Sequence, residues 1–264
     1  MDPMTQFKEQ QKIAWSNFVN FENITATVAP GLLAFAGVKA GAAILDVACG
    51  TGVVALTAAR LGADATGLDL TPELVARAKE NAGLMGLNVE WHEGDAERLP
   101  FPDARFDFVI SQFGHMFAPR PDVVTAEMLR VLKPGGTLAF VTWPLEMFTG
   151  RMYGLIGRYA PPRPGVASPA LWGDPDVIQE RLGAGVKDIV FARDAMLIPA
   201  LSTQHYRIFM EQNLGPMTRL LQSLDNSDPD KASALRREFE SLAAQYFENN
   251  RVCQDYLMTR AIKV

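Results

Sequence analysis

Cysteine and histidine are scarce in this chain of 264 residues. The two cysteines, Cys49 and Cys253, lie far apart and lack the spacing of a metal knuckle or a redox pair. The three histidines, His92, His115 and His205, never form the His-x-x-x-His pattern of a metal site. The sequence therefore predicts a reduced protein without a bound metal.

Long apolar runs and clusters of positive charge are also missing. The apolar stretch 26–38 is interrupted by Pro30 and is too short to cross a bilayer, and the polar start of the chain differs from a signal peptide. The net charge is −5, and no run of Lys and Arg offers a patch for a phosphate backbone. We therefore expect a cytoplasmic protein with no integral membrane segment and no nucleic acid partner; a homodimer is left open.

Strand-like and helix-like segments alternate over about a hundred residues. Short apolar runs, at 43–47, 65–69, 89–92, 106–110 and 137–142, are separated by stretches with helical spacing and short loops. This alternation is typical of a parallel sheet that is covered by helices on both faces and joined by right-handed crossovers. The sequence predicts an α/β fold.

A glycine-rich turn follows the first of these strands, in the run Asp46-Val47-Ala48-Cys49-Gly50-Thr51-Gly52. Glycine lets the backbone turn tightly and lets a ligand approach closely, and the helix that begins near Val53 offers free amide donors. The pattern Gly50-x-Gly52-x-x-Ala55 also fits a dinucleotide fingerprint, so an NAD(P)-dependent oxidoreductase is one alternative. We interpret Cys49 as a small buried filler.

Acidic side chains follow successive strands. Asp69 ends the second strand, where a carboxylate accepts hydrogen bonds from ribose hydroxyls, or else it is a solvated loop acid. Asp95 follows the third strand, where it would accept from an adenine amino group. Asp46 would lie near a cationic aminopropyl group, or else it braces the turn. Acids at these places repel a pyrophosphate and attract an ammonium and a sulfonium, so the charges favour S-adenosylmethionine over NAD.

The same residues carry a family resemblance. The run 45–52 resembles motif I of the class I methyltransferases, and the segments 94–101, 106–109 and 132–136 resemble the branch that contains the ubiquinone and menaquinone C-methyltransferases (methyltransferase type 11). The resemblance implies S-adenosylmethionine as cofactor and S-adenosylhomocysteine as product. It also implies that the cofactor is lined by Asp46, Ala48, Gly50, Gly52, Asp69, Leu70, Asp95, Ala96 and Gln112. Ala48 departs from the family pattern, which usually has glycine there.

The resemblance further implies a Rossmann-like, doubly wound sheet of seven strands, mostly parallel and closed by an antiparallel hairpin. We expect a single methyltransferase domain over residues 1–264. Its parts are N-terminal helices (1–40), a cofactor-binding core (41–143), a helical substrate lid (144–173 and 200–250) and the closing hairpin (186–198 and 252–262).

The acceptor side is less marked, because a sulfonium methyl group is already activated and the protein mainly has to orient it. We predict in-line displacement onto an O, N or C atom of a small, apolar or aromatic molecule. His115, which follows the fourth strand, is the candidate general base, or else it packs in the core. Trp15, Phe113 and Phe117 are candidates to border the sulfonium through cation–π attraction, Trp15 being the one assigned to the cofactor site. His92 is predicted to be structural. A protein that binds the cofactor without catalysis is a further alternative.

Overall fold

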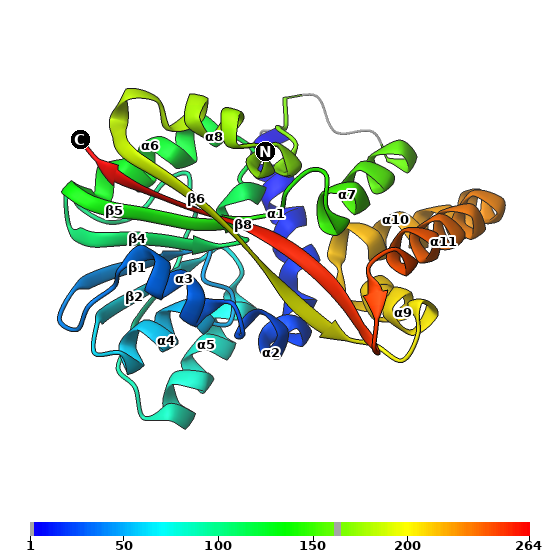
Figure 1. Cartoon of the computed structure of the whole chain (residues 1–264), viewed down its shortest axis with the longest axis horizontal. Helices are drawn as coiled ribbons and strands as arrows, with labels where there is room; N and C mark the ends of the chain where they lie inside the picture. Colours follow the sequence, from blue (N-terminus) through cyan, green and yellow to red (C-terminus); the bar gives the residue numbers. More distant parts are fainter. Residues whose placement is uncertain (1–2, 161–164) are drawn as a thin grey trace.

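The computed structural model describes residues 3–160 and 165–264 (Figure 1). Its strands are β1 (Ala43–Val47), β2 (Asp64–Asp69), β3 (Glu90–Glu93), β4 (Phe106–Gln112), β5 (Leu132–Thr142), β6 (Val186–Pro199), β7 (Phe247–Glu248) and β8 (Arg251–Lys263). Its α-helices are α1 (Pro3–Trp15), α2 (Glu22–Thr25), α3 (Ala29–Ala36), α4 (Val53–Arg60), α5 (Pro72–Met85), α6 (Pro121–Val131), α7 (Phe148–Tyr159), α8 (Pro175–Leu182), α9 (Thr203–Asn213), α10 (Gly215–Ser227) and α11 (Pro229–Ala244). Short 3₁₀ turns are η1 (Ser16–Phe21), η2 (His115–Phe117), η3 (Pro169–Gly173) and η4 (Gly183–Gly185).

One sheet runs through the described part of the chain in the order β3-β2-β1-β4-β5-β8-β6, and the two-residue β7 pairs with β8 beside this path. Strands β1 to β5 run parallel to one another, whereas β8 is antiparallel to both β5 and β6. The predicted mostly parallel sheet with an antiparallel closing hairpin is therefore confirmed. The strand order reverses between β1 and β4, and ligands of doubly wound sheets bind at such a switch point, beside the carboxyl ends of the strands.

Helices cover the sheet on both faces. Because the chain moves in opposite directions from β1 to β2 and from β4 to β5, right-handed crossovers place α4 and α6 on opposite faces. Helices α3, α4 and α5 contact one another in series, and α6 contacts α8. The central strands are buried between them: Ile44, Leu68 and Val109 are fully enclosed. This burial fixes the strand ends that carry the candidate site.

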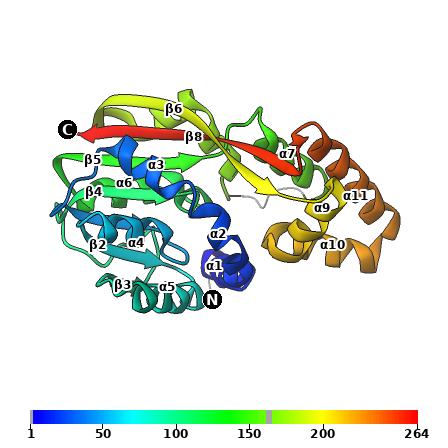
Figure 2. The ribbon, with the colours of Figure 1, turned by 60° about the horizontal axis from the view of Figure 1, so that its bottom comes forward.

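The hairpin of β6 and β8 is longer than the strand it joins. β8 pairs with β5 only over Leu257–Ile262, but with β6 from Arg251 onward. The remaining two-stranded ribbon extends past the sheet to the cluster formed by α7, α9, α10 and α11, as Figures 1 and 2 show. Helix α1 lies between this cluster and the sheet in both views and contacts α10. The seam between the two parts of the molecule is therefore covered by the N-terminal helix.

Within residues 3–160 and 165–264, every helix falls short of the length and apolar character that a membrane span needs.

Candidate active site

A large cavity opens at the carboxyl ends of β1, β2, β3 and β4 and continues under α1, α7 and α9. Its volume is about 1230 Å³, including its open mouth. Its lining runs from the strand ends to the helices, so a ligand bound at the strand ends would face the helices across the same cavity.

The turn after β1 forms one wall of the cavity. Ala48 and Gly50 line it, and both have left-handed backbone, with φ of 56° and 55°. A non-glycine residue rarely adopts this conformation, so Ala48 stands where glycine is easier, in agreement with its departure from the family pattern. Gly52 also has a positive φ, of 84°, but a Cβ there would lie 2.5 Å from the ring of Trp91. Gly52 is therefore required by packing behind the turn and is not part of the cavity lining.

Asp69, at the end of β2, lines the cavity and holds the turn in place. Its Oδ2 accepts a hydrogen bond from the backbone N–H of Gly50 and its Oδ1 accepts one from that of Thr71, each at 2.8 Å. The residue is 7% exposed, and burial raises the pKa of its carboxyl group while the backbone donors oppose that shift. Each carboxylate oxygen can accept a second hydrogen bond, so Asp69 retains capacity for ligand hydroxyls.

Asp46 has a different position from the other acids. It is buried behind the turn, its Oδ2 accepts from the backbone N–H of Ala55 at 3.0 Å, and it does not line the cavity. Burial, reinforced by the nearby charge of Asp69, raises the pKa of Asp46 to about 8. The structure thus shows Asp46 bracing the start of α4, and its contact with a ligand stays a prediction.

Asp95, after β3, lines the cavity and is paired with the N-terminal helix. Lys8 Nζ lies 2.5 Å from Asp95 Oδ2 and 2.5 Å from Glu97 Oε2, and the lysine side chain is only 14% exposed. Glu97 is nearly fully buried and is also bound by the guanidinium of Arg120. Asp95 Oδ1 accepts from the backbone N–H of Glu97. Leu70 and Ala96 complete this end of the lining. An ion-pair network therefore fastens α1 over the cavity.

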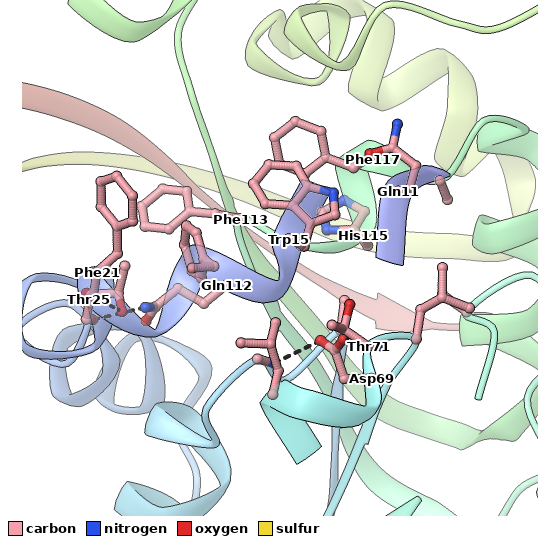
Figure 3. A pocket seen from close by; sticks show the side chains of 18 of the residues that line it. Gln11, Trp15, Phe21, Thr25, Asp69, Thr71, Gln112, Phe113, His115 and Phe117 are labelled. Atoms are coloured by element: carbon pink, nitrogen blue, oxygen red, sulfur yellow. Dashed lines mark hydrogen bonds between the residues drawn. The ribbon is translucent and has the colours of Figure 1, made fainter. Parts of the chain in front are cut away.

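Gln112 and Phe113 come from the end of β4. The Nε2 of Gln112 donates to the carbonyl oxygen of Thr25 at 2.8 Å, as Figure 3 shows, whereas its Oε1 is buried without a partner. Phe113 has a φ of 60° and its ring stacks on Trp143 with the centroids 3.9 Å apart. Non-glycine residues with left-handed backbone thus stand at the ends of two neighbouring strands, β1 and β4. Such strain is typical of functional sites.

His115 lines the cavity but is almost completely buried, at 1% exposure. Its ring packs against Phe140 and Trp172, each with centroids 4.6 Å apart, and neither ring nitrogen has a hydrogen-bond partner within residues 3–160 and 165–264. Burial, together with the positive charge of Arg181, lowers the pKa of His115 to about 3. The ring is therefore neutral at physiological pH, and its role as a base stays a prediction.

The remaining wall is aromatic, aliphatic and methionine-rich. Trp15 packs against Phe117 with ring centroids 4.6 Å apart (Figure 3). Among the described residues that line the cavity, the charged side chains are Lys8, Asp69 and Asp95, all at one end. The other end is lined by Phe117, Trp143, Met152, Tyr153, Met196, Met210 and Leu214, with Thr149 and Gln254 as polar members. The cavity thus has a charged end and an uncharged end.

Two residues singled out from the sequence lie outside the cavity lining. His92 Nε2 donates a hydrogen bond to Glu90 Oε1 at 2.7 Å, and its ring makes an edge contact with Phe101, in agreement with a structural role. Cys49 is buried, and burial raises the pKa of its thiol, so the sulfur stays protonated.

Sequence reasoning missed Lys8, Gln11 and Thr149, which line the cavity. Gln11 and Trp15 are one helical turn apart on α1, and Lys8 is three residues before Gln11, so the three side chains share one face of the helix. This spacing of three and four residues is the sequence signal that could have found them. The apolar Ile13 of the same helix is 73% exposed, so apolar spacing alone does not identify this face. Thr149 had no local signal, because α7 lies in a segment dominated by Pro and Gly.

Comparisons with known proteins agree with this arrangement. Residues 45–140 match the family model of a methyltransferase domain. An uncharacterized protein of Mycobacterium tuberculosis is 36% identical over 244 residues, which make up 92% of this chain and 89% of that protein. A demethylmenaquinone methyltransferase of Thermus thermophilus is 41% identical over 108 residues, or 40% of this chain and 49% of that protein.

Solved structures share the fold. The YcgJ protein of Bacillus subtilis superposes with a TM-score of 0.59 at 19% identity, over 90% of this chain and 98% of that one. A phosphoethanolamine N-methyltransferase 2 of Haemonchus contortus, in complex with S-adenosylhomocysteine, gives a TM-score of 0.58 at 19% identity, over 90% of this chain and 52% of that one. Together with the strand order, the matched methyltransferase domain and the demethylmenaquinone methyltransferase relative show that the chain belongs to the class I S-adenosylmethionine-dependent methyltransferases.

Proposed function

We propose that the protein transfers a methyl group from S-adenosylmethionine to a small, uncharged and largely apolar or aromatic acceptor. The observation that carries this proposal is the polarity of the cavity. Its charged end lies at the carboxyl ends of β2 and β3, and its uncharged end lies under the helical cluster. A polar nucleoside fits the first and an apolar acceptor the second, because an unpaired charge buried in the second end would cost several kcal/mol.

The residues at the charged end fit the cofactor. Asp69 has spare acceptor capacity for ribose hydroxyls and Asp95 for the adenine amino group. The buried, unpartnered Oε1 of Gln112 is an acceptor that an ammonium group would satisfy. Bound there, S-adenosylmethionine supplies a methyl group that is activated by its sulfonium. Family membership removes the nicotinamide alternative that the glycine pattern had left open.

The chain's own contribution to transfer is orientation and exclusion of water. The aromatic rings of Phe113, Trp143 and Phe117 restrict the orientation of a planar acceptor in the cavity. Helix α1, which carries Trp15, covers the cavity and excludes water. Restricting the approach of two reactants in this way can supply ~7–11 kcal/mol of the barrier. The helices α7, α9 and α10 serve as the substrate lid in this proposal.

His115 would accept the acceptor's proton on its unprotonated ring nitrogen. A base with a pKa of about 3 removes a proton from a neutral hydroxyl only when methylation makes that proton strongly acidic. The proton transfer would therefore accompany or follow carbon–oxygen bond formation.

A screen with tritiated S-adenosylmethionine tests the proposal. We expect the protein to label an uncharged aromatic or apolar member of a metabolite library. Asp69→Asn should lower S-adenosylhomocysteine affinity by ~10–100-fold, since a charge-assisted hydrogen bond contributes ~1.5–3 kcal/mol. Asp64→Asn, at the exposed start of the same strand, is the matched control and should bind normally. Tight cofactor binding without any labelled product would favour the non-catalytic alternative.

A further inference from the structure

At the uncharged end of the cavity, two buried polar side chains find no hydrogen-bond partner in the part of the chain that the structure describes. His115 is 1% exposed and both of its ring nitrogens are unpartnered; Thr149 is 4% exposed and its Oγ1 is unpartnered. Both side chains line the cavity. Buried polar groups in folded proteins are nearly always satisfied, and leaving one unpaired is costly. The pair therefore points to a ligand that supplies the missing hydrogen bonds.

The surrounding structure fixes both groups in place. The backbone N–H of His115 donates to Ser111 Oγ at 3.1 Å, and its ring is held between Phe140 and Trp172. Thr149 lies in the first turn of α7. That turn presses on the preceding loop, since a Cβ on Gly150 would lie 2.2 Å from a backbone oxygen there. Turn η3 packs against both η2 and α7, so it joins the segments that carry the two side chains.

The chemistry of the two groups selects the kind of ligand. A neutral imidazole has one donor and one acceptor, and a threonine hydroxyl can also donate and accept. A hydroxyl group on the ligand can satisfy each of them in either direction. A carboxylate could accept from both and an ammonium could donate to both, but each would bring a charge into the uncharged end of the cavity, where an unpaired buried charge costs several kcal/mol. The nearest cation, Arg181, stacks on Trp172 at 4.5 Å and is not part of the cavity lining. Its charge also faces the acids Asp122 and Glu180.

We propose that His115 and Thr149 form a subsite for an un-ionised hydroxyl group on a planar aromatic acceptor. The proposal rests on the proposed function and narrows its acceptor to phenol-like molecules. The same cavity is lined by Phe117 and by the stacked pair Phe113 and Trp143, whose flat rings suit a planar aromatic acceptor.

Binding to the S-adenosylhomocysteine complex of the whole protein tests the subsite. The probes are 2-naphthol, 2-naphthoate and naphthalene, which share one ring system and differ in the polar group. We expect 2-naphthol to bind at least ~10-fold more tightly than 2-naphthoate in isothermal titration. Equal or tighter binding of 2-naphthoate, or no binding of 2-naphthol, would overturn the proposal.

Variants separate the two side chains from the cavity walls. Thr149→Val keeps the shape and removes the hydroxyl, so 2-naphthol affinity should fall by ~5–10-fold while naphthalene affinity stays unchanged. Thr149→Ser restores the hydroxyl and should bind like the native protein. His115→Phe should weaken 2-naphthol by a similar factor. Unchanged 2-naphthol affinity in both Thr149→Val and His115→Phe would contradict the subsite. If the native protein itself does not bind S-adenosylhomocysteine, the proposed function is refuted instead.

Discussion

Lys8→Met removes the side chain that fastens α1 over the charged end of the cavity. Lys8 Nζ contacts Asp95 and Glu97, and its side chain is 14% exposed against 32% for Asp95 and 1% for Glu97. The change leaves two carboxylates close together with one cation fewer, although Arg120 still binds Glu97. We therefore expect the closed position of α1 to lose stability relative to an open one.

The magnitude follows from the burial of the partners. Breaking a fully buried ion pair costs ~3–5 kcal/mol, and an exposed pair contributes ~0–1 kcal/mol. The Lys8 network lies between these limits because Asp95 is partly exposed and Glu97 keeps Arg120, so we expect ~1–3 kcal/mol. If the bound product leaves only when α1 opens, this loss predicts release of S-adenosylhomocysteine that is ~5–150-fold faster.

Stopped-flow tryptophan fluorescence measures the release rate, since Trp15 on α1 lines the cavity. Lys12→Met is the matched control on the next turn of the same helix. Lys12 lies 3.4 Å from Glu9 and 3.5 Å from Glu93, both of them exposed, so its removal should change the rate by less than ~5-fold. An unchanged rate in Lys8→Met, or equal rates in the two variants, would refute the role of Lys8 as a fastening of the lid.

Other substitutions test separate parts of the site. Gly52→Ala should lower the free energy of unfolding by ~2–4 kcal/mol in urea titration, because the added Cβ would meet Trp91 and the φ of this residue is positive. In Gly50→Ala the added Cβ meets open space, so a smaller loss of stability in Gly52→Ala than in Gly50→Ala would contradict this reason. Gly50→Ala should mainly weaken S-adenosylhomocysteine binding, as measured by isothermal titration. Gln112→Leu should weaken it ~5–10-fold through loss of a buried acceptor. The ring resonances of His115 should stay constant from pH 5 to pH 8, because burial lowers its pKa to about 3 and the ring protonates only as the pH falls toward that value; a midpoint near 6.5 would show a solvated ring.

The sheet and its strand ends were predictable because their signals are local. Alternating apolar runs and glycine turns placed β1, β2 and β4 within a few residues, and the acids that follow them had to meet at one edge. The break between α2 and α3 and the continuity of β6 were not predictable in this way. The sequence predicted N-terminal helices over 1–40 without their bounds, and a hairpin arm at 186–198. Pairing with β8 extends that arm to Pro199 as one strand.

The parts of the site that sequence reasoning missed depend on contacts between distant segments. Lys8 and Asp95 are 87 positions apart, and only the packing of α1 across the sheet edge brings them together. Asp46 was assigned to the ligand from its charge, but its position behind the turn follows from the alternation of side chains along β1. The sequence could place charges along the chain, whereas tertiary packing decides which of them face the cavity.

A crystal structure with S-adenosylhomocysteine would show which end of the cavity holds the cofactor. We expect the nucleoside at the charged end, with its ribose at Asp69 and its adenine near Asp95 beneath α1, and the sulfur facing the uncharged end that contains His115. Electron density for the nucleoside at the uncharged end, or outside the cavity, would contradict the division of the cavity into a cofactor end and an acceptor end.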